Sequence, residues 1–265
     1  MSNLKLKLVL AGATFLTLFL WVNAIDFWSK ILPTNLFDPL TANLSDRALA
    51  DTFAQYVPPV GRDRIERTEG AGSRGCPAGS FGSLSLLIPS DHVGLTATGR
   101  PIFSWYVSSL PSTLMQFALV EPGVPKPLIV KQFQSVKSGI MQLEIPPEVP
   151  ELSVGKVYRW TVSLVCNHQR PSENIYVRSW ILRVANPIAT NTENASLNSP
   201  AQILRDRAAV YARSGIWYDA VANISKAYLA DPKDDLNYQY LRFLLNGVGL
   251  TEVPISQPQP LIADR

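Results

Sequence analysis

The chain has 265 residues, 46% of which are hydrophobic, and a formal net charge of +3. This length is enough for one or two small domains with hydrophobic cores of their own. The charge is too evenly balanced to indicate a nucleic acid or an acidic surface as the partner.

Residues 1–24 have the layout of a secretory signal peptide. Lys5 and Lys7 precede an uncharged apolar run, and residues 22–24 place small side chains just before the expected cleavage site. That order is typical of cleaved leaders. We therefore expect the chain to be exported to the periplasm, the cell envelope or the extracellular space. The alternative is that residues 8–25 stay attached and anchor the protein in a membrane; a buried core helix fits the flanking residues less well.

Cys76 and Cys166 are the two cysteines of the chain. In an oxidising compartment two cysteines most simply pair, so we expect a disulfide bond between them. In the chain-entropy model, closing such a long loop stabilises a fold by roughly 4–5 kcal/mol. The alternative is two buried free thiols. A metal site is disfavoured, because His92 and His168 are the only histidines and no ligand spacing surrounds them.

Residues 25–75 lack a sustained period and are expected to form a flexible N-terminal segment and linker. Within them, residues 45–56 are expected to form a short helix that Pro58 and Pro59 end. Residues 61–75 are rich in glycine and in charges of alternating sign, which favours a solvated tether.

Residues 76–186 change to short runs in which apolar and polar residues alternate. Seven runs, separated by turn-forming residues, are expected to be strands: 84–88, 103–107, 115–119, 128–133, 141–145, 158–166 and 180–184. Short strands without intervening helices favour an antiparallel β-sandwich of the immunoglobulin or fibronectin type. The alternation predicts that Trp105, Trp160 and Trp180 lie in the core, with Cys166 on the same face as Trp160.

One local motif supports the sandwich. Residues 152–158 resemble the Leu-x-Pro-x-x-x-Tyr corner of fibronectin type III domains, with Val154 in place of the usual proline. In that motif the tyrosine hydroxyl bonds back to the upstream backbone, and we expect the same of Tyr158. The alternative is an ordinary strand tyrosine.

Residues 187–199 are polar and turn-rich and are expected to be a linker. A helical period then runs over residues 200–250. It predicts three helices: one capped by Ser199 and ended by Gly215, one from Trp217 to just before Pro232, and one capped by Asp235. The tail, residues 251–265, contains three prolines and is expected to fray.

The first two helices resemble one tetratricopeptide repeat. Small and aromatic residues fall in the spacing of that family: Leu204, Ala208, Tyr211, Gly215, Trp217, Ala220, Ala227 and Pro232. Leu204 stands where tryptophan is usual, and Ala208 where glycine is usual. The small residues would let the helices approach closely, with the third helix as a cap. Since a lone repeat offers little groove, packing on another element is favoured over direct ligand binding.

The chain also resembles a known family over residues 71–250. Four blocks carry the resemblance in order: residues 73–79, 94–106, 154–160 and 215–220. Together they are similar to a family of exported cyanobacterial proteins catalogued only as a domain of unknown function. The resemblance implies a signal peptide, a β domain and a helical tail, and it implies no activity.

Motifs that would carry chemistry are not evident. Residues 70–75 lack the Lys-Ser/Thr that follows a phosphate-binding loop, and residues 79–82 lack the spacing of a nucleophile elbow. His92 and His168 both fall in predicted turns and are expected at the surface. We therefore expect no catalytic residues, no cofactor and no metal.

Tyr106, Tyr176 and Arg178 are the candidate contact residues, because we expect the two tyrosines to be exposed and Tyr176 to lie close to Arg178. By analogy with scaffolds used for binding, the sequence favours an exported, non-enzymatic interaction or structural module of the cell envelope with a protein partner. A carbohydrate-binding sandwich of the cell wall is the first alternative. A hydrolase is the second.

Overall fold

The computed structural model describes residues 52–60, 68–70, 83–108, 114–134, 137–167, 169–170, 172, 174–187 and 199–261. The chain divides into two units, Met1–Leu49 and Ala50–Arg265, and every described residue belongs to the second. The predicted signal peptide, Cys76 and His168 lie outside the described residues. In the described part, none of the helices has the length and hydrophobicity that a membrane span requires.

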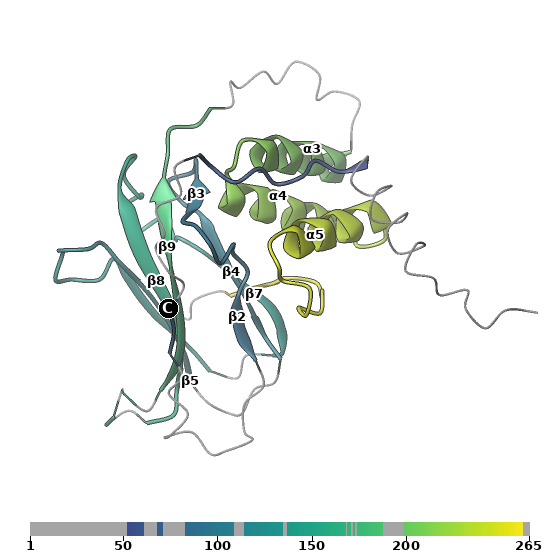
Figure 1. Cartoon of the computed structure of the whole chain (residues 1–265). Coiled ribbons are helices and arrows are strands. Elements are labelled where there is room, and N and C mark those ends of the chain that lie inside the picture. The colour runs from purple at the N-terminus through teal and green to yellow at the C-terminus, as the bar shows by residue number, and fades with distance from the viewer. Residues whose placement is uncertain are drawn as a thin grey trace, which may run out of the picture. The chain divides into compact units, whose positions relative to one another are not determined.

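Two sheets and three helices make up the described residues, so the fold is of the β plus α class (Figure 1). In sheet A the strand order is β1 (Thr68–Gly70), β9 (Ile175–Arg183), β8 (Val157–Val165), β5 (Leu114–Val120) and β6 (Ile129–Phe133), with β3 (Gly94–Thr96) also beside β9. In sheet B the order is β10 (Gln259–Pro260), β7 (Gly139–Glu144), β4 (Ile102–Val107) and β2 (Leu84–Leu86).

All seven predicted strands are present, as β2 and β4 to β9. The expectation of a purely antiparallel arrangement is wrong, because β3 pairs with β9 and β10 pairs with β7 in parallel. Both additions are short strands. A long stretch of chain, rather than a hairpin turn, separates each of them from its partner strand, and such a connection permits parallel pairing.

Aromatic side chains from the two sheets meet in a common core. The ring centroid of Phe103 on β4 lies 5.0 Å from that of Phe117 on β5 and 5.0 Å from that of Trp160 on β8. Trp105 donates a hydrogen bond from Nε1 to Sδ of Met115 at 3.3 Å. These rings are fully buried, as the alternation of β4, β5 and β8 predicted. Burial of large aromatic side chains is a dominant contribution to core stability.

The predicted phase of β9 is wrong. Val177, Ser179 and Ile181 are its buried residues, whereas Trp180 is only half-buried. The pairing with β8 explains the error, because it sets Trp180 opposite Arg159, which alternates with the inward-facing Trp160. Residues paired across strands share a face, so Trp180 stands on the outside of sheet A.

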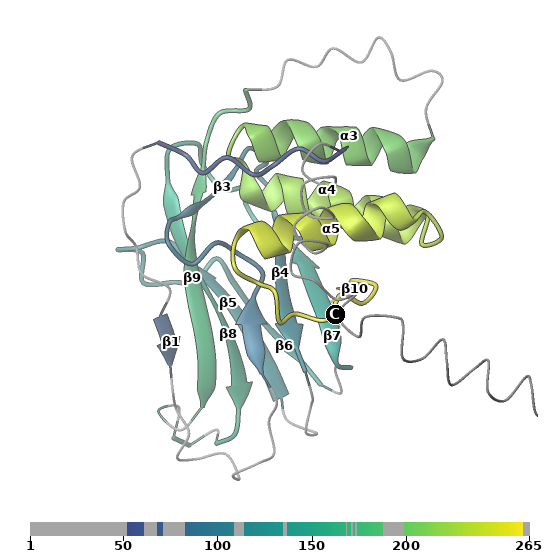
Figure 2. The same cartoon turned by 45° about the vertical axis from the view of Figure 1, so that its right-hand side comes forward.

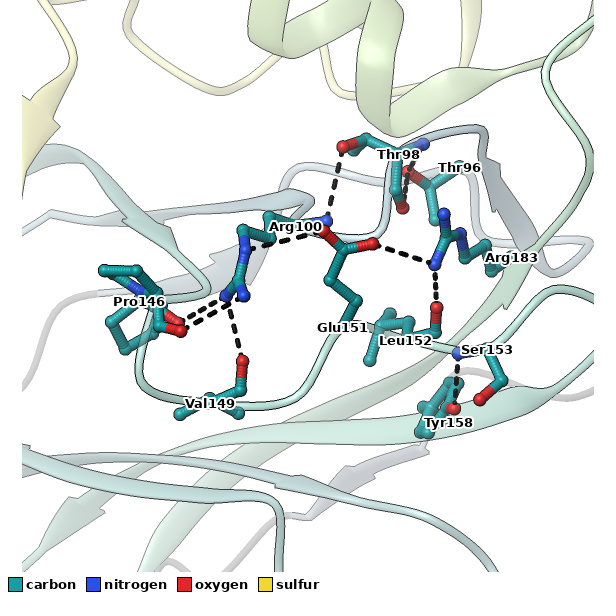
Figure 3. Close-up of polar contacts among 11 residues, drawn as sticks. Thr96, Thr98, Arg100, Pro146, Val149, Glu151, Leu152, Ser153, Tyr158 and Arg183 are labelled. Atoms are coloured by element: carbon teal, nitrogen blue, oxygen red, sulfur yellow. Dashed lines mark hydrogen bonds and ion pairs between the residues drawn. The ribbon is translucent and has the colours of Figure 1, made fainter.

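The tyrosine corner has the expected geometry. The backbone N–H of Ser153 donates to the hydroxyl oxygen of Tyr158 at 2.9 Å (Figure 3). The prediction that Tyr158 bonds back to the upstream backbone is therefore confirmed.

Two arginines hold the loop that leads into this corner. Arg100 donates to the carbonyl oxygens of Pro146 at 2.6 Å and Val149 at 2.9 Å, and Arg183 donates to that of Leu152 (Figure 3). Glu151 lies between the two guanidinium groups, 3.7 Å from Nε of Arg100 and 3.4 Å from Nη1 of Arg183. The two arginines thus share one carboxylate and bond otherwise to backbone carbonyls.

The three predicted helices are α3 (Pro200–Arg213), α4 (Trp217–Ala230) and α5 (Asp235–Gly247). Ser199 caps α3, since its side chain accepts a hydrogen bond from the backbone N–H of Gln202. The cap of α5 is Asp234 rather than Asp235, because the Asp234 carboxylate accepts from the first turn. Gly215, with φ of +73°, makes the turn between α3 and α4.

Small residues line the contact between α3 and α4. Ala208 and Ala212 of α3, and Ala220 and Ala227 of α4, are fully buried. Side chains of this size let two helices approach closely, as predicted from the sequence.

Residues 251–261 do not fray, which corrects the expectation for the tail. The N–H of Leu261 donates to the carbonyl of Gln142 at 2.7 Å, and the N–H of Ile140 donates to Oγ of Ser256 at 3.3 Å. The tail thus pairs with the open edge of β7 in front of sheet B (Figure 2). The edge of a sheet offers unpaired backbone groups, and a nearby extended segment satisfies them despite its prolines.

Candidate functional site

Helix α4 is joined to sheet A by buried hydrogen bonds. Tyr218 accepts a hydrogen bond from Nε1 of Trp160 at 2.7 Å and donates one to the carbonyl of Trp180 at 3.2 Å. Its ring also meets that of Phe103 edge-on at 5.8 Å. Burial raises the pKa of Tyr218 well above its ordinary value, so the hydroxyl stays protonated and serves as a structural link.

Asp219 makes a second link, to the segment that contains β3. Its carboxylate accepts hydrogen bonds from Oγ1 of Thr96 at 2.8 Å and from the N–H of Ala97 at 3.0 Å. Burial raises the pKa of Asp219, and these hydrogen bonds oppose that rise. A buried carboxylate whose oxygen accepts these hydrogen bonds serves to join the helix to the sheet.

The side of the helices that faces the sheets is closely filled. Trp217 donates from Nε1 to the carbonyl of Leu87 at 2.8 Å. At Gly94 a Cβ atom would lie only 2.6 Å from the ring of Tyr218, so only glycine fits there without a shift. At these two positions α4 therefore packs directly against the β domain.

Another surface of the helices is covered by residues 52–60, which we call the strap (Figure 2). Phe53 stacks on Tyr240 of α5 with ring centroids 4.9 Å apart, and Tyr240 donates from its hydroxyl to the carbonyl of Ala54 at 3.0 Å. The N–H of Val57 donates to the carbonyl of Ala212 of α3 at 3.0 Å. The strap is extended from Ala54 onward, so the end of the helix predicted over residues 45–56 is wrong, and residues 45–51 lie outside the described part. Contacts with α3 and α5 hold this segment extended, although its sequence pattern favoured a helix.

His92 is buried, with 4% of its surface exposed, and the prediction that it lies at the surface is wrong. Its Nε2 lies 2.7 Å from the hydroxyl of Tyr56 in the strap, and its Nδ1 lies 2.7 Å from the carboxylate of Asp91. Tyr56 in turn meets Trp217 edge-on at 4.8 Å. Tyr56 of the strap is the residue that covers the imidazole. It comes from a distant part of the sequence, so the residues around His92 could not predict the burial.

An Asp–His–Tyr chain can carry protons in an enzyme; here the tyrosine belongs to the strap and the imidazole between the two partners is buried. A cavity of about 220 Å³ lies elsewhere, between α5 and residues 251–255, and is lined by Tyr238, Arg242 and Asn246. It contains none of the three residues of the chain. Among the described residues there is also no group of three or more His, Cys, Asp or Glu side chains that could hold a metal ion.

Tyr106 is not a surface residue, and its prediction as a contact is wrong. It lies on β4, between β2 and β7, where all six residues are buried, and only 9% of its surface is exposed. One face of β4 packs against the aromatic core, and the helices and the tail lie on the other side of sheet B (Figures 1 and 2). A strand covered on both faces has no exposed phase.

Tyr176 and Arg178 lie together on the outside of sheet A, as expected. The guanidinium carbon of Arg178 lies 4.4 Å from the centroid of the Tyr176 ring. A second stack of the same kind, which the sequence analysis missed, has the guanidinium of Arg159 over Trp180 at 5.8 Å. The wrong phase of β9 had assigned Trp180 to the core. The order Tyr-x-Arg-x-Trp along β9 was the available signal.

We call the surface around these stacks the outer face of sheet A. It comprises the outward residues of four adjacent strands: Leu114, Gln116, Ala118, Val120, Val130, Gln132, Val157, Arg159, Thr161, Ser163, Val165, Tyr176, Arg178, Trp180 and Leu182. The helices lie on the opposite side of sheet A from this face, where Tyr218 of α4 contacts the inward-facing Trp160 (Figure 1). Among the described elements, sheet A therefore presents a surface that no helix covers.

The two arginines are the charged members of the outer face of sheet A. Within the described residues neither Arg159 nor Arg178 forms an ion pair or donates a side-chain hydrogen bond. Nε of Arg178 is buried without a hydrogen-bond partner. The arrangement is chemically suited to binding through positive charge, aromatic area and hydroxyl or amide groups.

Cys166 follows the end of β8 and is half-buried, and its N–H donates to Oδ1 of Asn174 at 3.0 Å. Cys76 lies outside the described residues, so the disulfide bond stays a prediction.

Comparison with known proteins places the chain in a family. No curated protein gives a significant match. A family model described as Domain of Unknown Function (DUF928) matches residues 69–258, close to the range of the resemblance seen in the sequence. This range spans β2 to β9 and all three helices. The chain therefore belongs to the DUF928 family, a domain of unknown function.

Proposed function

We propose that the protein is an exported, non-catalytic interaction module of the cell envelope, which binds a protein partner through the outer face of sheet A. The observation that carries the proposal is the pair of guanidinium–aromatic stacks on the neighbouring strands β8 and β9. Tryptophan, tyrosine and arginine are the residue types that contribute most to binding energy at protein interfaces. Here two arginine–aromatic pairs, one with tyrosine and one with tryptophan, stand on a surface that no described helix covers.

The helices serve in this proposal as a brace. A tetratricopeptide-like hairpin could bind an extended peptide, but the strap already covers a surface of the helices, where Phe53 stacks on Tyr240 and Tyr56 meets Trp217. The buried hydrogen bonds of Tyr218 and Asp219 close the side toward the sheets. We further propose that the two sheets form an immunoglobulin-like sandwich, which the aromatic contacts between the sheets and the corner at Tyr158 support.

Export and the disulfide bond belong to the same proposal. The layout of residues 1–24 supports export, and the position of Cys166 at the end of a core strand suits a bond that ties the entry segment to the sheet. Intact-mass measurement of the mature chain tests both points. We expect a chain without its leader and lighter by two hydrogens than the reduced form. A retained leader together with two freely alkylated thiols would contradict the proposal.

Capture from a detergent-solubilised envelope fraction tests the contact face. Immobilised mature protein is compared with a variant that carries Tyr176→Ala and Trp180→Ala, and with a control that carries Tyr228→Ala and Tyr238→Ala on the helices. We expect a protein that the wild type and the control retain and that the sheet variant loses by at least about tenfold, as for a hot spot. Equal retention by all three proteins, or no retained protein, would refute the proposal.

A carbohydrate-binding role is the second candidate. Tyr176 and Trp180 stand on the same side of β9, four positions apart, so their rings are spaced by roughly 13 Å along one line. Such a row suits the apolar faces of two sugars of one chain that are not direct neighbours. Retention on isolated cell-wall polysaccharide that the aromatic variant loses would favour this candidate. Passage of the wild type through that material without retardation would exclude it.

A further inference from the structure

The charges on the outer face of sheet A indicate the chemistry of its partner. We infer that this face binds an extended acidic segment of a protein, with carboxylates on alternate residues. The inference rests on the proposed function and adds the partner's charge and spacing.

Arg159 and Arg178 differ from the paired arginines of the structure. Arg100 and Arg183 share Glu151, and Nη1 of Arg205 lies 2.5 Å from the carboxylate of Asp234. The two arginines of the outer face stack on aromatic rings instead, and no ion pair to either is present in the described part of the chain. Their charges therefore remain available to a ligand.

The outward positions of β5, β6, β8 and β9 contain no acidic residue. Besides the two arginines and two aromatic residues they carry hydroxyl groups, amides and aliphatic side chains, which are neutral. One of these amides, on Gln132, donates to the side chain of Gln116 at 3.1 Å. The face thus presents two positive charges without local compensation, and charge complementarity selects an anionic partner.

The stacks also hold the guanidinium groups in place. Each ring covers one face of a planar cation, and Nε of Arg178 is buried, so the terminal nitrogens are the donors that a ligand can reach. A guanidinium group that is already positioned loses less conformational freedom when it binds a carboxylate. Partial burial also strengthens the attraction relative to a fully exposed pair.

Strand register gives the spacing of the two charges. Arg159 pairs with Trp180, and Arg178 lies two positions before Trp180, so the arginines are diagonal neighbours on adjacent strands. Such neighbours are about 7–8 Å apart. Carboxylates on alternate residues of an extended chain are separated by about 7 Å. An Asp/Glu-x-Asp/Glu segment therefore matches both arginines at once, whereas carboxylates on adjacent residues point to opposite sides.

Fluorescence anisotropy with synthetic peptides tests the inference on the mature wild-type protein. The probes are a peptide of alternating glutamate and threonine, the same peptide with glutamine for glutamate, and a third of equal composition whose glutamates are in adjacent pairs. We expect the alternating peptide to bind best, the paired peptide at least about fivefold more weakly, and the glutamine peptide not measurably. Equal binding of the alternating and glutamine peptides would overturn the inference, as would equal binding of the alternating and paired peptides.

Charge variants assign the binding to the face. Arg159→Gln and Arg178→Gln are each expected to weaken the alternating peptide at least about fivefold. The control variant carries Arg207→Gln and Lys226→Gln, two exposed cations of the helices, and is expected to bind as the wild type does. Equal losses in face and control variants would show attraction by net charge alone and would overturn the inference.

A soluble polygalacturonate serves as the carboxylated polysaccharide. If it binds more tightly than the alternating peptide and depends on the two arginines, the inference of a protein partner is wrong. If no probe binds while an envelope protein is still lost on Tyr176→Ala and Trp180→Ala, the acidic partner is refuted and the proposed function stands.

Discussion

Tyr218→Phe removes one oxygen atom from the junction between α4 and sheet A. The change leaves the indole N–H of Trp160 buried without an acceptor, because its hydrogen bond to Tyr218 is 2.7 Å long and the site is closed to water. An unsatisfied buried group costs about 1–3 kcal/mol. The longer bond to the Trp180 carbonyl, 3.2 Å, adds a smaller loss. We expect the free energy of unfolding to fall by about 2–3 kcal/mol.

Urea unfolding of the oxidised mature protein measures this change, with tryptophan fluorescence for the core around the buried tryptophans of the sheets and of α4, and far-UV circular dichroism for the helices. The control is Tyr228→Phe, whose ring meets that of Tyr238 at 6.1 Å away from the sheets, and which should change stability by less than about 0.5 kcal/mol. A loss for Tyr218→Phe no larger than that of the control would refute the reasoning. Separate unfolding transitions for the two probes in the wild type would also refute it, because they would show that the helices and the sheets do not unfold as one unit.

Three further changes test other contacts. Burial raises the pKa of Asp219, so the fold favours the protonated form of its carboxyl group. The free energy of unfolding of the wild type should therefore fall as pH rises from below the unfolded-state pKa through the folded-state pKa. Asp219→Asn should remove this fall in urea titrations at several pH values, and an unchanged dependence of stability on pH would count against the burial argument. Gly215→Ala places a Cβ atom 2.9 Å from the carbonyl oxygen of Val57 at a positive φ and should cost about 1–2 kcal/mol by thermal unfolding. Gly247→Ala, with open space around it, is the matched control and should cost nothing. Phe53→Ala should destabilise the protein by about 3 kcal/mol and speed proteolysis within the strap, whereas an unchanged cleavage rate would show that the ring does not hold it.

Elements whose signals are local could be predicted from the sequence. The alternation of β8 correctly identified Tyr158, Trp160 and Val162 as core residues. Ser199 caps α3 because a hydroxyl at that position meets free N–H groups of the first turn. The same holds for the bond made by Tyr158, which depends on a turn of only a few residues.

Features that depend on distant partners could not be predicted. Whether Trp180 faces in or out is set by its pairing with Arg159, since β9 carries apolar side chains in both phases. Tyr106 is buried because a second layer lies over its strand, and His92 is buried because Tyr56 reaches it from 36 positions away. For the contact face, the sequence identified Tyr176 and Arg178, and the register added the second stack.

Hydroxyl-radical footprinting of the mature protein, alone and bound to its envelope partner, locates the contact face most directly. It reports the solvent access of tyrosine and tryptophan rings one by one. Oxidation of Tyr176 and Trp180 should fall severalfold on binding, while that of Tyr228 and Tyr238 on the helices stays the same. Protection of the helical tyrosines with unchanged oxidation on β9 would place the partner on the other side of the molecule and contradict the assignment.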